Sequence, residues 1–144
     1  MKNLFKFLLI IFIFFFLNSC SYVSLFFVQN LKNQDLKVLI EFEHLINDKD
    51  LKNMPSLFTS NVDKLKDFHK ETNRTKLEYE LVNERTISVI LPKNSISKID
   101  VAVNRKTNIT KIFYTDNDKK IELERNTLLK KSKFKSQGIL FKIK

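Results

Sequence analysis

The sequence predicts an α+β domain in which N-terminal amphipathic helices pack on a curved antiparallel β-sheet, preceded by an apolar signal helix. Two observations predict this fold. Apolar residues recur at helical spacing just after residue 34, and from Leu77 onward they alternate with charged residues in short runs. Turn signals closely separate these runs, which favours antiparallel pairing with one apolar face for the helices to cover.

The helical part is expected between residues 34 and 70. Six apolar residues recur at spacings of three and four over 34–47: Leu36, Leu39, Ile40, Phe42, Leu45 and Ile46. A charged turn follows at 48–50, where Asp50 can cap a second short helix that continues to Phe58. The spacing of Val62, Leu65 and Phe68 indicates one further helical turn or two.

The strands are expected after Asn73, where the apolar period changes to two. The expected strands cover residues 77–81, 87–91, 99–103, 109–114, 119–125 and 139–144. Asn, Asp, Pro and Ser separate them at turn positions.

The first twenty residues have the parts of an export signal. Lys2 and Lys6 precede the apolar run Phe7–Leu17, and Leu17-Asn18-Ser19-Cys20 follows with the chain's one cysteine. This segment resembles a bacterial lipoprotein lipobox, of the lax kind found in spirochaetal-type lipoproteins. The resemblance puts Leu17 third before the cut, Ser19 last and Cys20 first in the mature chain, while Asn18 departs from the usual small or β-branched residue.

The resemblance implies that the Cys20 thiolate takes a diacylglyceryl group, and that further acyl chains such as palmitate follow. Two or more chains hold a protein lastingly at a membrane. We therefore expect a signal peptide at 1–19, a short apolar tether at 20–33 and one α+β domain at 34–144. The tether would either pack on the domain or lie in the membrane interface. An uncleaved signal anchor is the alternative, although the continuous apolar run of Phe7–Leu17 is too short to span a bilayer.

Composition excludes several function classes. Gly138 is the only glycine, which excludes Gly-rich nucleotide-binding loops, and a single cysteine leaves no internal disulfide. The two histidines, His44 and His69, stand in no metal-ligand spacing, so no metal or other cofactor is expected. Acid–base catalysis would have to use residues such as Asp100, His44, Tyr79 and Tyr114, which form no recognisable motif. A non-enzymatic domain is the favoured interpretation.

Positive charge is concentrated at the carboxyl end. Residues 21–100 contain 12 Lys and Arg against 12 Asp and Glu, whereas residues 101–144 contain 12 against 4. The densest cluster is Lys130, Lys131, Lys133 and Lys135. Such a region attracts anionic lipid head groups or polymers, and export makes nucleic acid the least favoured partner. The alternative is an ordinary solvated sheet face.

Residues 41–58 resemble the opening of nuclear transport factor 2-like domains, in which an amphipathic helix, a polar turn with Asp and a short helix ending near an aromatic pair precede a curved sheet. Pro55 and residues 61–73 depart from that pattern. The resemblance implies a cone-shaped, cystatin-like fold with a pocket between sheet and helix. Relatives use this pocket as an active site or as a binding surface.

Three functions remain open at this point. The first is a lipid-anchored, non-enzymatic binding or assembly domain of the cell envelope, with an envelope protein as partner. The second is a surface lipoprotein that binds anionic polymers through its basic carboxyl-terminal region. The third is a small-molecule carrier or enzyme that uses the pocket. All three place the domain outside the cytoplasm, on the periplasmic or surface side of the inner or outer bacterial membrane.

Replacing Cys20 with Ala should abolish acylation, because no other thiol is available in the chain. We expect the intact mass of protein purified from its native membrane to fit a chain that starts at Cys20 and carries acyl groups. The C20A variant should lack that mass. Unacylated full-length protein in both preparations would instead indicate an uncleaved anchor.

Overall fold

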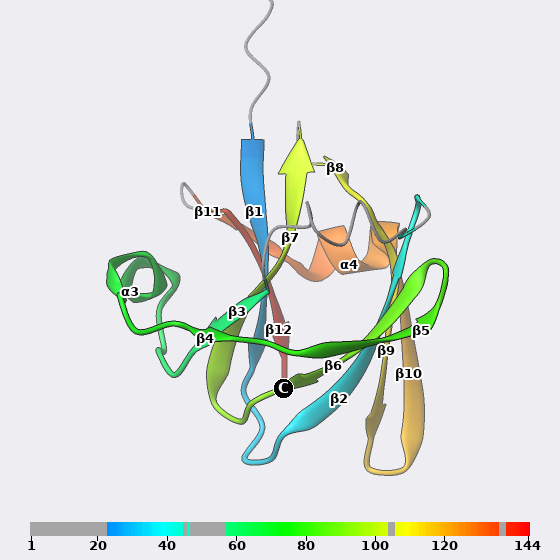
Figure 1. Cartoon of the computed structure of the whole chain (residues 1–144), viewed down its shortest axis with the longest axis horizontal. Helices are drawn as coiled ribbons and strands as arrows, with labels where there is room; N and C mark the ends of the chain where they lie inside the picture. The colour runs from blue at the N-terminus through cyan, green and yellow to red at the C-terminus, as the bar shows by residue number, and fades with distance from the viewer. Residues whose placement is uncertain (1–22, 45, 47–56, 104–105, 136–137) are drawn as a thin grey trace, which may run out of the picture.

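Two β-sheets face each other across an apolar core in the computed structural model of this chain (Figure 1). The structure describes residues 23–44, 46, 57–103, 106–135 and 138–144. Over these residues the fold is a mixed α+β arrangement dominated by antiparallel strands. Two short helices accompany the sheets within the same residues.

Sheet A contains seven strands in the order β11-β12-β1-β7-β3-β4, and β8 pairs with β7 beside this path. Their bounds are β1 Val23–Asn30, β3 Phe58–Ser60, β4 Thr75–Lys76, β7 Ser95–Val103, β8 Lys106–Thr107, β11 Lys133–Lys135 and β12 Gly138–Ile143. Strand β1 is central, since it pairs in parallel with β12 and antiparallel with β7.

Sheet B contains five antiparallel strands in the order β10-β9-β2-β6-β5. Their bounds are β2 Leu36–Phe42, β5 Tyr79–Asn83, β6 Thr86–Leu91, β9 Ile109–Asp116 and β10 Lys119–Glu124. The turn between β9 and β10 has positive φ at Asn117 and Asp118, which is the geometry of a tight hairpin turn. Strand β2 is central, between β6 and β9.

The two helices occupy different places. Helix α4, Arg125–Lys131, contacts β9 and β10 of sheet B and β12 of sheet A, and it carries the chain from one sheet to the other (Figure 1). Helix α3, Leu65–Lys70, lies outside the sandwich. It packs on the outer face of sheet A through Phe68, whose ring centroid is 5.2 Å from that of Phe27.

Alternation along β1 divides the apolar residues between two clusters. Phe26 and Val28 point into the main core between the sheets, whereas Phe27 points outward to α3. The outer cluster consists of the buried residues Phe27, Leu65, Phe68, Ile96 and Leu140. Sheet A is therefore apolar on both faces at its centre, and sheet B is apolar mainly on its inner face.

The predicted helix over 34–47 is wrong for residues 36–42, which form β2. Leu36, Val38, Ile40 and Phe42 are buried at a period of two, with Lys37 and Glu41 on the other face. Because Leu39 is also apolar, the apolar residues of this segment fit the helical period as well as the strand period of two. Two features favour the strand. Val38 and Ile40 are β-branched, and the segment pairs with β6 on one side and with β9 on the other.

Of the two alternatives for the expected tether at 20–33, the structure shows packing on the domain for residues 23–30. Residues 23–30 form β1, the central strand of sheet A, in which Phe26, Phe27 and Val28 are fully buried. The folded unit therefore includes residues assigned to the tether. The signal peptide at 1–19 and residues 50–56 of the second predicted helix lie outside the described residues. The helix was predicted to continue to Phe58, which instead begins β3.

Most predictions for the chain after residue 61 agree with the structure. Strands predicted at 87–91, 99–103, 109–114, 119–125 and 139–144 are confirmed with small shifts of their ends, and the helical turn at 62–68 is confirmed as α3. Strand β5 begins at Tyr79 and not at Leu77. The helix α4 was not predicted. The sheet is not covered by N-terminal helices over the described residues, so the arrangement implied by the nuclear transport factor 2-like resemblance is not found at 36–42.

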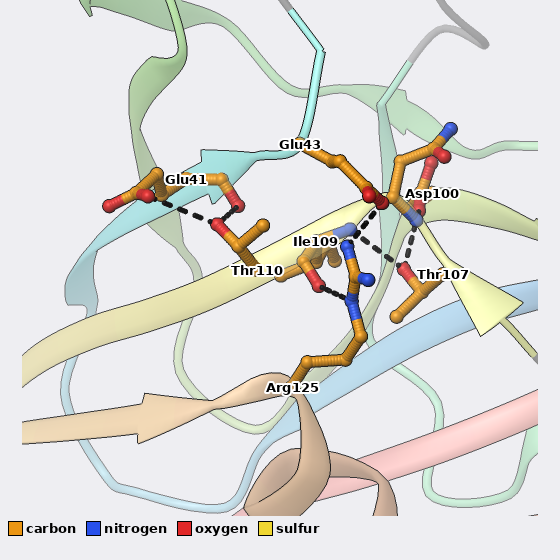
Figure 2. Close-up of polar contacts among 8 residues, drawn as sticks. Glu41, Glu43, Asp100, Thr107, Ile109, Thr110 and Arg125 are labelled. Atoms are coloured by element: carbon orange, nitrogen blue, oxygen red, sulfur yellow. Dashed lines mark hydrogen bonds and ion pairs between the residues drawn. The ribbon is translucent and has the colours of Figure 1, made fainter.

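A polar network ties the end of β2 to the start of β9 and to α4 (Figure 2). Arg125, the first residue of α4, donates from Nε to the carbonyl of Ile109 at 2.9 Å and pairs with Glu43 at 2.7 Å. The Thr110 hydroxyl donates to the Glu41 carbonyl at 3.1 Å. These contacts fix where the chain leaves sheet B for α4.

Asp100 belongs to the same region but comes from sheet A (Figure 2). Its carboxylate is buried and accepts hydrogen bonds from the Thr107 hydroxyl and from the backbone N–H of Asn108. The Thr107 hydroxyl in turn accepts from the N–H of Ile109. The buried charge thus has partners at the point where the chain passes from β8 to β9, as burial of a carboxylate requires.

Replacing Gly138 with Ala should destabilise the fold. Gly138 has φ +145°, and a Cβ there would overlap the Leu25 carbonyl oxygen and lie 2.8 Å from the Phe27 ring. We expect the free energy of unfolding to fall by at least about 2 kcal/mol. Urea unfolding measures it, with Asn126→Ala on the exposed side of α4 as the control. An unchanged stability for G138A would contradict the described packing of β12 on β1.

Candidate anion-binding face

A shallow groove of about 350 Å³ lies on the outer face of sheet A, between α3 and the hairpin β11–β12. We call it the lysine groove. Its lining consists of Asp63, Lys64, Leu65, Lys66, Lys133, Lys135, Leu140 and Lys142. Five of these eight side chains are lysines, which come from two segments about 70 residues apart in sequence.

The hairpin β11–β12 forms one wall of the lysine groove. Lys133 lies opposite Leu140 and Lys135 lies opposite Gly138, and directly paired residues of antiparallel strands share a face. Lys142 is two residues beyond Leu140 and therefore shares that face as well. Successive lysines on one strand are thus about 7 Å apart.

Helix α3 forms the other wall. Leu65 and Phe68 are buried against Phe27 and Leu140, which holds this short helix on the sheet. The amide of Gln29 donates to the carbonyl of Asp63 at 3.2 Å and fixes the segment that enters α3. Packing of the apolar side of α3 leaves Lys64 and Lys66 exposed at the rim of the groove.

The positive charge of the lysine groove is not neutralised by ion pairs within the described residues. The pairs described there join Lys32 to Asp116, Lys111 to Glu122 and Arg125 to Glu43, all away from the groove. Asp63 is the one acidic residue in the lining. The groove lining therefore has an excess of positive charge, which can attract an anionic ligand.

A second cationic pair, Arg74 and Lys98, lies on the same face at the other side of α3. Lys98 of β7 pairs in register with Phe27 and with Phe58, so it shares their face, and its Nζ is 5.4 Å from the Phe58 ring centroid. The Arg74 guanidinium lies 5.2 Å over the Phe68 ring. Burial, and secondarily the neighbouring charge of Arg74, lower the pKa of Lys98.

The outer face of sheet B has a different character. A hollow of about 850 Å³ there is lined in its centre by Leu39, Ser88 and Phe113. Its charged rim has both signs: Lys37 and Lys120 against Asp35, Glu80 and Asp118. This hollow lies on the outside of a sheet, not between sheet and helix as the resemblance implied. Its balanced charge gives no preference for an anionic ligand.

The candidate acid–base residues do not converge. Tyr79 and Tyr114 lie on one rung of sheet B, but β6 and β2 separate them, which puts them about 14 Å apart across the sheet. Asp100 belongs to sheet A and is engaged by Thr107. His44 is exposed after the end of β2. These positions form no catalytic constellation.

The described residues contain no group of three or more His, Cys, Asp or Glu side chains arranged to hold a metal ion. Within the same part of the chain, neither helix has the length and apolar character needed to cross a membrane.

The structure separates the four lysines singled out from the sequence. Lys133 and Lys135 line the lysine groove, whereas Lys130 and Lys131 are exposed on α4 and do not line it. Sequence reasoning missed Lys64, Lys66 and Lys142 as groove residues, because no local signal joins α3 to the last strand. The lipobox residues Leu17, Asn18, Ser19 and Cys20 lie outside the described residues.

Comparison of the chain with models of protein families, with curated proteins and with solved structures finds no match in any of the three.

Replacing Arg74 with Gln should raise the pKa of Lys98 part of the way toward 10.5, since burial, the larger cause of its lowering, remains. NMR of the Lys98 side chain across the alkaline range measures this, with Arg85→Gln as the control of equal charge. The lowered pKa also means that the unfolded state keeps its proton longer. Lys98 therefore adds to the free energy of unfolding as pH rises from its folded pKa toward 10.5. An unchanged Lys98 pKa in R74Q would show that the two cations are not close.

Proposed function

We propose that this protein is a lipid-anchored, non-enzymatic binding domain of the bacterial cell envelope whose ligand is an anionic polymer held in the lysine groove. The observation that supports the ligand class is the convergence of Lys64, Lys66, Lys133, Lys135 and Lys142 around one groove. The basis for the location is the resemblance of the first twenty residues to a lipoprotein export signal, with Cys20 as the first mature residue.

Convergence from separate segments distinguishes the groove from a run of solvated lysines. In a lysine-rich chain, lysines close in sequence, such as Lys133 and Lys135, can occur together without any functional reason. Lys64 and Lys66 join them only because α3 packs on Phe27 and Leu140. Like charges brought together cost electrostatic energy, and a bound polyanion would offset this cost.

The shape of the groove favours a chain-like ligand over a flat membrane surface. Its two sides are α3 and the hairpin β11–β12, and both sides carry lysines. A linear polymer can enter between such walls and meet lysines on both sides.

The proposed anchor places this groove near the membrane. Strand β1 begins at Val23, three residues after Cys20, and three residues of extended chain span at most about 11 Å. An acylated Cys20 would thus hold sheet A close to the bilayer. The lysine groove would then face polymers that lie along the membrane within the envelope.

A non-enzymatic role is supported by the positions of the candidate acid–base residues. Tyr79, Tyr114, Asp100 and His44 are distributed over both sheets and a loop, so these four candidates do not meet in one described pocket. Binding needs no such pair, and the groove offers charge without a catalytic group.

Replacing Lys133, Lys135 and Lys142 together with Gln should weaken binding to heparin, used here as a test polyanion, by roughly a hundredfold, at about 1 kcal/mol per removed charge contact. Binding is measured by titration calorimetry at several salt concentrations. The wild-type dissociation constant should rise steeply with salt, and the variant should show a shallower slope.

The matched control replaces Lys37 and Lys120 on the outer face of sheet B, together with Lys119 at the start of β10, with Gln, which removes the same charge away from the lysine groove. It should retain binding within about threefold, since distant charges are screened. Equal losses in both triple variants would indicate attraction by net charge alone and would contradict the groove as the binding site.

A further inference from the structure

We propose that Arg74 and Lys98 form a second anion subsite on the outer face of sheet A, so that the ligand is a polymer long enough to contact both sides of α3. This inference rests on the proposed function of the lysine groove. It extends that function by defining the ligand as a linear chain of repeated oxyanion groups and not an isolated anion.

Arg74 is held in position before any ligand arrives. Its Nε donates to the carbonyl of Glu71 at 2.9 Å, and its Nη2 is 3.3 Å from the carbonyl of His69. The guanidinium also stacks over the buried Phe68 ring. An arginine fixed in this way loses little side-chain freedom on binding, and its remaining N–H groups match an oxyanion with two oxygens.

Lys98 is placed near Arg74 by the sheet. It sits in β7 at the level of Phe58, and β4, which Arg74 immediately precedes, pairs with β3 at Phe58 and Thr59. The half-buried ammonium lies against the Phe58 ring. In the part of the chain that the structure describes, no carboxylate forms an ion pair with either cation. Two unpaired cations held together on aromatic rings form a site that an anion would stabilise.

The surface between the two sites is also basic. Helix α3 separates them and exposes Lys66 and Lys70, whereas its apolar side chains point to the sheet. Strand β7, which carries Lys98, is three strand spacings from β11, or about 14 Å across the sheet. Lys66 already lines the lysine groove, so a chain that leaves the groove over α3 would meet Lys70 before it reaches Arg74.

Two subsites on one rigid face should act together through effective concentration. A polymer bound in the lysine groove presents its next charged groups to Arg74 and Lys98 at high local concentration, which strengthens binding without any new conformational change. A short chain can occupy only one subsite. The dependence of affinity on chain length therefore reports on the second subsite.

The test uses the full chain and two size-fractionated heparin oligosaccharides, one shorter than about 14 Å and one at least twice that length. For the wild type, the long oligosaccharide should bind at least about tenfold more tightly than the short one after correction for the number of overlapping sites. The variant R74Q/K98Q should lose most of this gain and bind the short oligosaccharide within about twofold of wild type.

The matched control R85Q/K93Q removes the same charge from exposed turns elsewhere and should keep the full gain. Thermal unfolding shows whether K98Q impairs folding. If it does, R74Q alone gives the same comparison, because it changes an exposed residue. A full length-dependent gain in R74Q overturns the second subsite and leaves the lysine groove intact. Failure of the wild type to bind either oligosaccharide overturns the groove itself.

Discussion

The position of β1 at the centre of sheet A is the constraint on which the rest of the structure depends. This strand is packed on both faces, with Phe26 and Val28 in the core between the sheets and Phe27 under α3. It also has a neighbour on each side, β12 in parallel and β7 antiparallel. The parallel pair requires the last strand of the chain to return beside the first described one. Helix α4 makes that return from sheet B.

The basic face follows from this arrangement. Because β12 must pair with β1, the short hairpin β11–β12 extends sheet A and brings its lysines to the face that α3 covers. Helix α3 packs on the outer face of sheet A and buries Phe27 there, and this packing places Lys64 and Lys66 on the same face. The same face also receives Arg74 and Lys98, whereas sheet B carries charges of both signs on its exposed face. The difference in charge between the outer faces of the two sheets therefore follows from the burial of these apolar residues.

The sequence predicted the part of the fold in which period and composition agree. Strands such as β6 and β9 alternate clearly, with β-branched residues and turn residues at their ends. It failed at β2, where Leu39 makes an apolar strand resemble a helix, and at β1, whose apolar run resembles part of an export or membrane segment. For the site, the local cluster Lys133 and Lys135 could be found in the sequence. Lys64, Lys142 and the pair Arg74 and Lys98 could not, since only tertiary packing joins them.

Backbone amide NMR of the folded chain during titration with a heparin oligosaccharide would test most directly whether the outer face of sheet A binds polyanions. We expect the largest shift changes at α3, at β11–β12 and around Arg74, with saturable behaviour and strong salt dependence. The amides of β5 and β6 in sheet B should change little. Shifts spread evenly over all exposed lysines, or centred on the hollow lined by Leu39 and Phe113, would contradict the assignment of function to this face.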